Sequence, residues 1–185
     1  MYSAYRFRSI ALAGCLAFAF SAPAFAAGEE TDQTKPPPKT ETTTKCAGGK
    51  IWDKTKKECV VPKKSSFNDD DLYKAAREFA YAGQYENAIA VLRLAENQND
   101  PRILNYLGYA NRKAGRMELG MSYYRKALLV DQNYILARSY MGQALMEQGD
   151  AQAARVQLVE IRDRGGENTW AYRSLLQSLN GYRTY

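Results

Sequence analysis

The chain has 185 residues, no histidine and a formal charge of +6, from 26 lysines and arginines against 20 aspartates and glutamates. Without histidine the chain lacks the commonest general base and the commonest metal ligand, which argues against an enzyme or a metal protein of the usual kinds. Beyond residue 67 the basic and acidic side chains nearly balance, 15 to 14, which disfavours a nucleic-acid-binding surface on the folded part.

Residues 1–26 have the order of a secretory signal peptide. Arg6 and Arg8 begin a positive segment, an apolar run follows, and residues 24–26 form an Ala-x-Ala cleavage site. The apolar run covers about 11 residues, short of the roughly 20 that span a membrane, so we expect only transient membrane contact. We therefore predict an exported chain, periplasmic or secreted, that begins at Ala27. Lipidation of Cys15, within a lipobox-like segment, is the alternative.

Two short segments follow the leader. Residues 27–45 are rich in Pro, Thr and Lys and contain no large apolar side chain, so we expect a disordered linker. Residues 46–62 are expected to form a hairpin of two short strands about a polar turn. Cys46 and Cys59 bracket this hairpin, and two cysteines close in sequence in an exported chain predict a disulfide. Two free thiols are the alternative.

From residue 68 onward the apolar residues recur at helical spacing. Asn68 is expected to cap a helix that opens with three aspartates, whose charges suit a helix N-terminus. The pair Asp100–Pro101 marks another helix start, with proline at the first helical position. Glycines recur where alternate helices should end. Residues 68–180 are therefore predicted to form an all-α domain of three helical hairpins and a capping helix.

The helical hairpins follow a repeat of 34 residues. Equivalent positions of two copies lie 34 residues apart. The middle copy has Leu107-Gly108, Gly115, Tyr124 and Ala127, and the next copy has Met141-Gly142, Gly149, Leu158 and Ile161 at the same positions. This spacing resembles that of the tetratricopeptide repeat family, most clearly in the segment L-G-Y-A-N-R-K-A-G-R-M-E-L-G at 107–120. The resemblance implies a solenoid whose concave groove binds protein segments. An irregular helical bundle is the rival fold.

The groove of such a solenoid is lined by the first helix of each hairpin, on the side away from its packing residues. The predicted protein-binding positions are Tyr73, Arg77, Asn105, Tyr109, Arg112 and Gln143. Tyrosine and arginine are common at the energetic centres of interfaces. We expect Asn105 and Tyr109 to be partly exposed, and the alternative for each tyrosine is packing between repeats. The family's carboxylate-clamp pattern is absent, so recognition of chaperone tails is not expected.

The cysteine segment resembles a second family. Its pattern C-x2-G-x2-W-D-x5-C-x2-P is similar to one half of a peritrophin-like chitin-binding domain of the invertebrate type. The resemblance implies a glycan contact through Trp52, because an aromatic face can pack on a sugar ring. The alternative is that Trp52 covers the disulfide.

These patterns predict a non-enzymatic exported scaffold or adaptor of the bacterial cell envelope that binds a protein or peptide partner. The alternative is a module that binds an envelope glycan through the hairpin, with the repeats as a spacer. The sequence contains no nucleophile elbow, phosphate-binding loop or paired-acid motif, so no catalytic residue, metal ligand or cofactor is assigned. A nucleic-acid partner is not expected.

Overall fold

The computed structural model describes residue 1, residues 36–64 and residues 66–181. The signal-peptide segment beyond Met1, the alternative at Cys15 and the first part of the predicted linker lie outside the described residues. Within those ranges the fold is mostly helical, with one small antiparallel hairpin and a disulfide between Cys46 and Cys59. This confirms the helical class, the hairpin and the disulfide.

The hairpin and the long helices follow one another in the predicted order, and a short helix that was not predicted precedes them. The helices are α1 (Glu41–Thr44), α2 (Asp69–Tyr81), α3 (Tyr85–Leu92), α4 (Pro101–Lys113), α5 (Met117–Val130), α6 (Ile135–Glu147), α7 (Ala151–Asp163) and α8 (Trp170–Leu179); the strands are β1 (Ile51–Asp53) and β2 (Glu58–Val60). None of the described helices is both long and apolar enough to cross a membrane.

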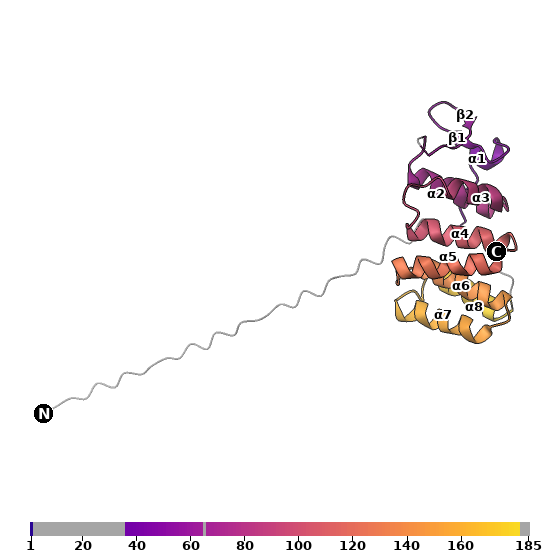
Figure 1. Ribbon diagram of the computed structural model, residues 1–185. Coiled ribbons are helices and arrows are strands. Elements are labelled where there is room, and N and C mark those ends of the chain that lie inside the picture. The colour runs from indigo at the N-terminus through magenta and orange to yellow at the C-terminus, as the bar shows by residue number, and fades with distance from the viewer. Residues whose placement is uncertain (2–35, 65, 182–185) are drawn as a thin grey trace.

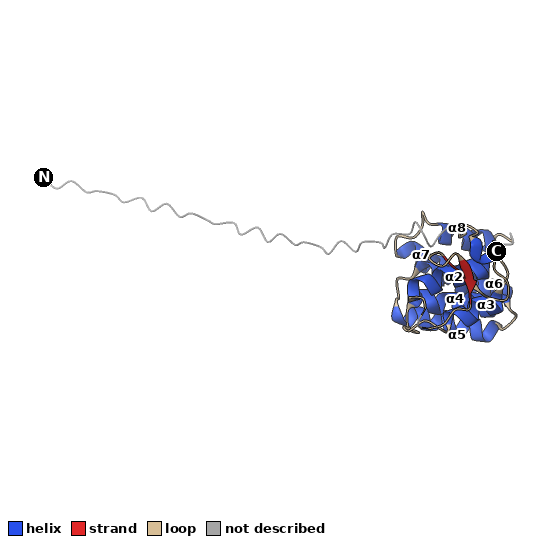
Figure 2. Ribbon diagram, turned by 90° about the horizontal axis from the view of Figure 1, so that it is seen from above, coloured by secondary structure: helices blue, strands red, loops and turns tan. Residues whose placement is uncertain are grey.

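The long helices pack in consecutive pairs. Helix α2 packs on α3, α4 on α5 and α6 on α7, and α8 packs against both helices of the last pair. The pairs are stacked in one direction, with α1 and the strands at the opposite end from α7 (Figure 1). Viewed from that end, the hairpin lies over the helices of the stack (Figure 2). Ile51 of β1 is 4% exposed and belongs to the same hydrophobic core as Leu72 of α2.

The predicted helix starts are confirmed in their details. The side chain of Asn68 accepts a hydrogen bond from the backbone N–H of Asp71 at 2.8 Å, which caps α2. Asp100 accepts from the N–H of Arg102 at 2.8 Å, and Pro101 takes the first position of α4. The free N–H groups of both first turns are thereby partly satisfied.

Glycines mark the closest approach between helices. A Cβ atom added to Gly108 of α4 would lie 2.6 Å from the ring of Tyr124 and 3.1 Å from the carbonyl oxygen of Gly120, both on α5. A Cβ on Gly142 of α6 would lie 2.6 Å from the side chain of Leu175 on α8. The small residues of the repeat are therefore needed where neighbouring helices touch.

Candidate functional site

The structure buries the six predicted groove residues. Each is 6% exposed or less, as holds for Tyr73, Arg77, Asn105, Tyr109, Arg112 and Gln143. The expectation that Asn105 and Tyr109 are partly exposed is therefore wrong. These side chains fill the space between neighbouring first helices instead of lining an open surface.

The two tyrosines of this set are buried against an aromatic ladder that crosses the stack from one helix pair to the next. We use the name aromatic ladder for Tyr73, Tyr106, Tyr140 and Trp170. Their ring centroids are 5.6, 6.2 and 6.4 Å apart in that order, each in an edge-on arrangement. Such edge-on contacts stabilise aromatic pairs beyond the area they bury. The tyrosines thus pack between repeats, which is the alternative that the sequence left open.

Two of the buried residues, Arg77 and Gln143, form hydrogen bonds within the stack, whereas the Tyr73 hydroxyl and the Asn105 amide have no hydrogen-bond partner among the described residues. The Nε of Arg77 donates to the hydroxyl of Tyr106 at 3.0 Å, and Gln143 donates to the hydroxyl of Ser174 at 3.1 Å, which joins α6 to α8. Burial raises the pKa of the Tyr73 phenol to about 12. A phenol so protected from water and a guanidinium so engaged belong to the interior of the fold.

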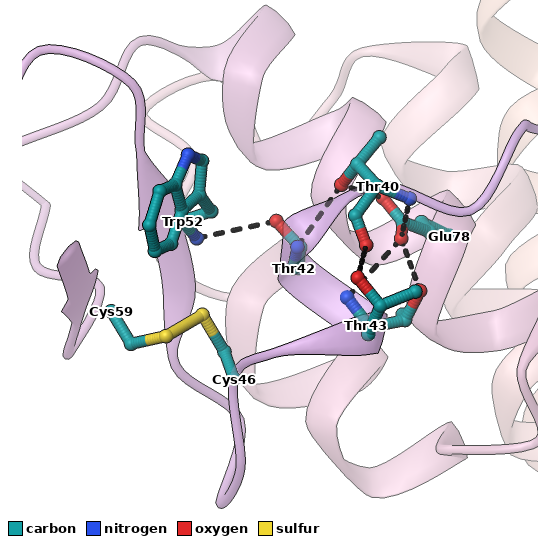
Figure 3. Close-up of a disulfide and its surroundings, with 8 residues drawn as sticks. Thr40, Thr42, Thr43, Cys46, Trp52, Cys59 and Glu78 are labelled. Carbon is teal, nitrogen blue, oxygen red and sulfur yellow. Dashed lines mark hydrogen bonds between the residues drawn. A yellow bond between two sulfur atoms is a disulfide. The ribbon is translucent and has the colours of Figure 1, made fainter. Parts of the chain in front are cut away.

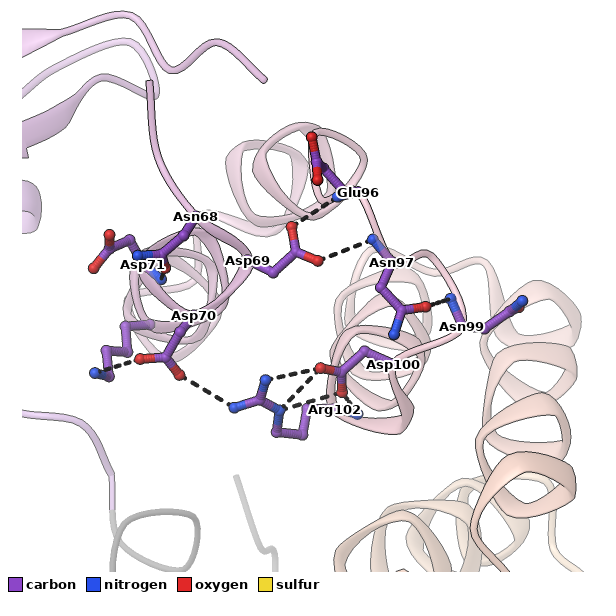
Figure 4. Close-up of polar contacts among 10 residues, drawn as sticks. Asn68, Asp69, Asp70, Asp71, Glu96, Asn97, Asn99, Asp100 and Arg102 are labelled. Carbon is purple, nitrogen blue, oxygen red and sulfur yellow. Dashed lines mark hydrogen bonds and ion pairs between the residues drawn. The ribbon is translucent and has the colours of Figure 1, made fainter. Parts of the chain in front are cut away.

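The carboxylates at the start of α2 and α4 are also structural (Figure 4). The carboxylate of Asp69 accepts the backbone N–H of Asn97 at 2.9 Å, and this hydrogen bond lowers the pKa of Asp69. Arg102 forms ion pairs with Asp70 at 3.1 Å and Asp100 at 2.8 Å. These contacts hold the first turn of α2 against the start of α4 and leave little carboxylate capacity for a ligand.

A pocket of about 1140 Å³ lies between the hairpin, the segment before it and α2. Its size is slightly above the usual range of roughly 300–1,000 Å³ for small-molecule sites, which suits a larger ligand. Apolar side chains from separate segments line it, including Pro37 and Pro38, Trp52 and Val60 of the strands, and Phe67 before α2. Of these residues the sequence singled out Trp52 alone, because the pocket is assembled from parts distant along the chain.

One wall of the pocket is formed by a segment that the sequence predicted to be disordered. The predicted linker 27–45 is ordered at its end, where Glu41–Thr44 forms the single turn α1. The buried carboxylate of Glu78 on α2 accepts hydrogen bonds from the N–H and the hydroxyl of Thr40, both at 2.7 Å (Figure 3). It also accepts from the N–H of Thr43 at 3.2 Å and from the Thr43 hydroxyl. The expectation of disorder is therefore wrong for this part, because polar contacts replace the missing apolar ones.

The hairpin is fixed to the same wall. The hydroxyl of Thr42 accepts the backbone N–H of Trp52 at 3.2 Å, which attaches α1 to β1 (Figure 3). The disulfide joins Cys46, just beyond α1, to Cys59 on β2, and Trp52 pairs with Cys59 across the strands. Trp52 is half-buried, lines the pocket, and has the ammonium group of Lys45 4.9 Å from its ring centroid.

Basic side chains outnumber carboxylates in the lining of this pocket. The lining contains five basic side chains (Lys54, Lys56, Lys63, Lys74 and Arg77) and three carboxylates (Asp53, Asp71 and Glu78). One of those carboxylates, Asp53, accepts the N–H groups of Thr55 and Lys56 in the hairpin turn, and the Lys56 N–H lowers its pKa. Lys54 and Lys63 are exposed lining residues that form no ion pair within the described part of the chain. The mouth of the pocket is therefore positively charged.

The side chains of the lining limit which ligands the pocket could hold. Among residues 36–64 and 66–181, no three Cys, Asp or Glu side chains come together as metal ligands. The lining combines aromatic and aliphatic side chains that can bury apolar groups with lysines that attract negative charge. Comparison with models of known protein families and with the sequences of curated proteins gives no match.

Proposed function

We propose that this chain is a non-enzymatic scaffold, exported to the bacterial periplasm or secreted, that binds a segment of a partner protein. The proposed architecture is a short solenoid of three tetratricopeptide-like hairpins with a capping helix. The 34-residue period and the stacked helix pairs support it. The basic, apolar, Ala-x-Ala order of the first 26 residues supports export, as does a disulfide, which persists in oxidising compartments.

The observation that carries the proposal is the pocket between the hairpin and α2. It is larger than most small-molecule sites, and apolar groups and lysines line it. The burial of the predicted groove residues moves the proposed binding site away from that groove to this pocket. A partner segment placed there would contact both the hairpin and the first repeat.

A pair of matched substitutions tests this assignment. Val60→Trp places a large side chain in the pocket, and Val156→Trp places the same side chain on the exposed face of α7. Immobilised wild-type chain and both variants are incubated with envelope extract, and retained proteins are compared. We expect one partner to be retained by the wild type and by Val156→Trp and lost with Val60→Trp. Equal retention by all three chains would place the partner elsewhere.

A glycan-binding module remains the second candidate, because Trp52 lines the pocket and is half-buried. In this case the hairpin contacts the sugar and the repeats act as a spacer. Titration with a tetramer of N-acetylglucosamine tests it by calorimetry. Binding that is lost in Trp52→Ala and kept in Trp52→Phe would favour the glycan, and no heat from the wild type would eliminate this sugar.

A further inference from the structure

We propose that the pocket binds an acidic, extended polypeptide segment in which apolar residues alternate with glutamates or aspartates. This inference rests on the proposed function and names the chemistry of the partner. The pocket consists of an apolar interior and a basic mouth. The interior favours the apolar residues of such a segment, and the mouth favours its acidic residues.

The interior selects apolar side chains. Ile51 is buried in its wall, and Trp52, Val60 and Phe67 are half-buried around it. The side chains of Trp52, Val60 and Phe67 keep exposed apolar surface that a ligand can remove from water. Apolar ligand groups therefore gain most by pointing inward.

The mouth selects negative charge. Lys54 belongs to the hairpin turn and Lys63 to the segment after β2, and both are exposed. Two lysines from separate segments of the lining, neither of them paired within the described residues, attract an anionic ligand and steer its approach. A carboxylate at the mouth also keeps its solvent contact, so it avoids the cost of burial.

An extended strand fits both requirements at once. Successive side chains of an extended chain point to opposite sides, so alternate residues can face the interior and the mouth. The apolar residues of the segment would enter the pocket beside Trp52, and the acidic residues between them would face Lys54 and Lys63. A helix would need a wider groove, because its diameter with side chains is about 10–12 Å.

Two other anionic partners suit the site less well. A membrane surface is contacted by several apolar side chains that project from a protein. Among the large apolar side chains of the lining Val61 projects in this way, whereas Trp52 and Phe67 are half-buried. A phosphate backbone is best held by arginine forks. The arginine in the lining, Arg77, is buried and donates to Tyr106, and the carboxylate of Glu78 lies in the same lining. A polypeptide is therefore the favoured occupant.

The test uses fluorescein-labelled octapeptides and the full mature chain. The acidic probe is Glu-Leu-Glu-Pro-Glu-Leu-Glu-Leu, in which acidic and apolar residues alternate, and its counterparts carry glutamine or lysine in place of every glutamate. Fluorescence anisotropy at low salt should give at least tenfold tighter binding for the acidic probe than for the glutamine probe, and no binding for the lysine probe. Because the attraction is between exposed charges, added salt should weaken it. Equal affinity for all three probes would overturn the inference.

Substitutions locate the binding. Lys54→Gln and Lys63→Gln should each weaken the acidic probe about two- to fivefold, the range expected for an exposed ion pair. Lys126→Gln on α5 is the matched control, because it removes an exposed lysine far from the lining, and it should leave the affinity unchanged. A loss of affinity as large in Lys126→Gln as in the other two would mean non-specific attraction and would overturn the site.

Two further probes separate the inference from the function on which it rests. Phosphatidylglycerol vesicles and a 20-base-pair DNA duplex are offered to the wild type and to Val60→Trp. Binding of either that is lost in Val60→Trp would assign the pocket to lipid or nucleic acid and overturn the acidic peptide. If the acidic probe fails while Val60→Trp still abolishes retention of an envelope protein, the scaffold function stands and the partner chemistry is wrong. If both fail, the pocket is not the binding site.

Discussion

The contact between Glu78 and α1 makes a sharp prediction, because one buried carboxylate holds a whole wall of the pocket. Glu78→Ala removes the carboxylate that accepts from the N–H and hydroxyl groups of Thr40 and Thr43, and leaves the Thr43 N–H only its bond to the Thr40 carbonyl oxygen at 3.3 Å. Alanine is the best helix former, so α2 itself should remain intact. We therefore expect α1 to detach from α2 while the helix pairs stay folded.

The magnitude follows from the kind of hydrogen bond that is lost. A hydrogen bond to a charged group contributes about 1.5–3 kcal/mol. The released groups of Thr40 and Thr43 regain water when α1 detaches, so the four bonds together should contribute about 2–3 kcal/mol to local closure. This range corresponds to roughly 30- to 150-fold faster amide exchange. Glu78→Gln keeps a carbonyl oxygen and an amide that can each meet one threonine, so its effect should stay below about tenfold.

Hydrogen exchange followed by mass spectrometry measures this directly. The reporters are the amides of residues 43–46, which donate to Thr40 and Glu41 and close α1. Peptides from α4 to α8 should exchange as in the wild type. Two outcomes would refute the reasoning: unchanged exchange at residues 43–46 in Glu78→Ala, or acceleration throughout the helix pairs. The first would mean that other contacts hold α1, and the second that α1 supports the whole fold.

Four further predictions concern the helix pairs and the hairpin. Gly108→Ala should lower the free energy of unfolding by about 1–2 kcal/mol in denaturant titrations, since its Cβ would meet a rigid ring and a carbonyl, whereas Gly142→Ala should cost less because it meets the flexible end of a leucine. Tyr109→Ala should cost about 3–5 kcal/mol by the same assay, and Asn105→Ala less, since both side chains are buried; no loss would contradict their burial. Reduction of the disulfide should speed exchange in the hairpin and leave the far-UV helical signal nearly unchanged, because neither cysteine lies in a helix; a large loss of helicity would contradict this. Stability should fall as the pH rises above about 10, because the folded chain holds the proton of Tyr73 to about pH 12 and the unfolded chain releases it near pH 10; equal stability at pH 9 and 11.5 would contradict the raised pKa.

The helical part of the fold could be predicted because its signals are local. The cap at Asn68 and the Asp100–Pro101 start each depend on neighbouring residues, and the structure has both. The burial of the predicted groove residues could not be predicted from such local signals. Helical spacing placed Tyr109 on the inner side, but its burial depends on rings from other helices, such as Tyr81 and Tyr140, which lie 6.0 and 5.0 Å away.

The pocket was missed for a related reason. The segment before the hairpin has no large apolar residue, and its order depends on Glu78, whose sequence separation from Thr40 is 38 residues. A local signal was nevertheless present. Thr40 precedes Glu41, which is the arrangement of an N-cap and an acidic first turn, and the structure uses it to begin α1. A contact between residues so far apart in sequence, such as Thr40 and Glu78, can be recognised only from the three-dimensional structure.

The position of the hairpin at one end of the stack has a consequence for assembly. A row of like units exposes an apolar end that matches the next unit, and copies of the chain could then join end to end into filaments. Ile51 fills the core beside Leu72 at this end, while the lysine-rich turn faces outward. Two copies approaching through this end would meet like charges, and the core beside Leu72 is already filled by Ile51 of the same chain. The disulfide-closed hairpin thus terminates the row, in addition to shaping the pocket.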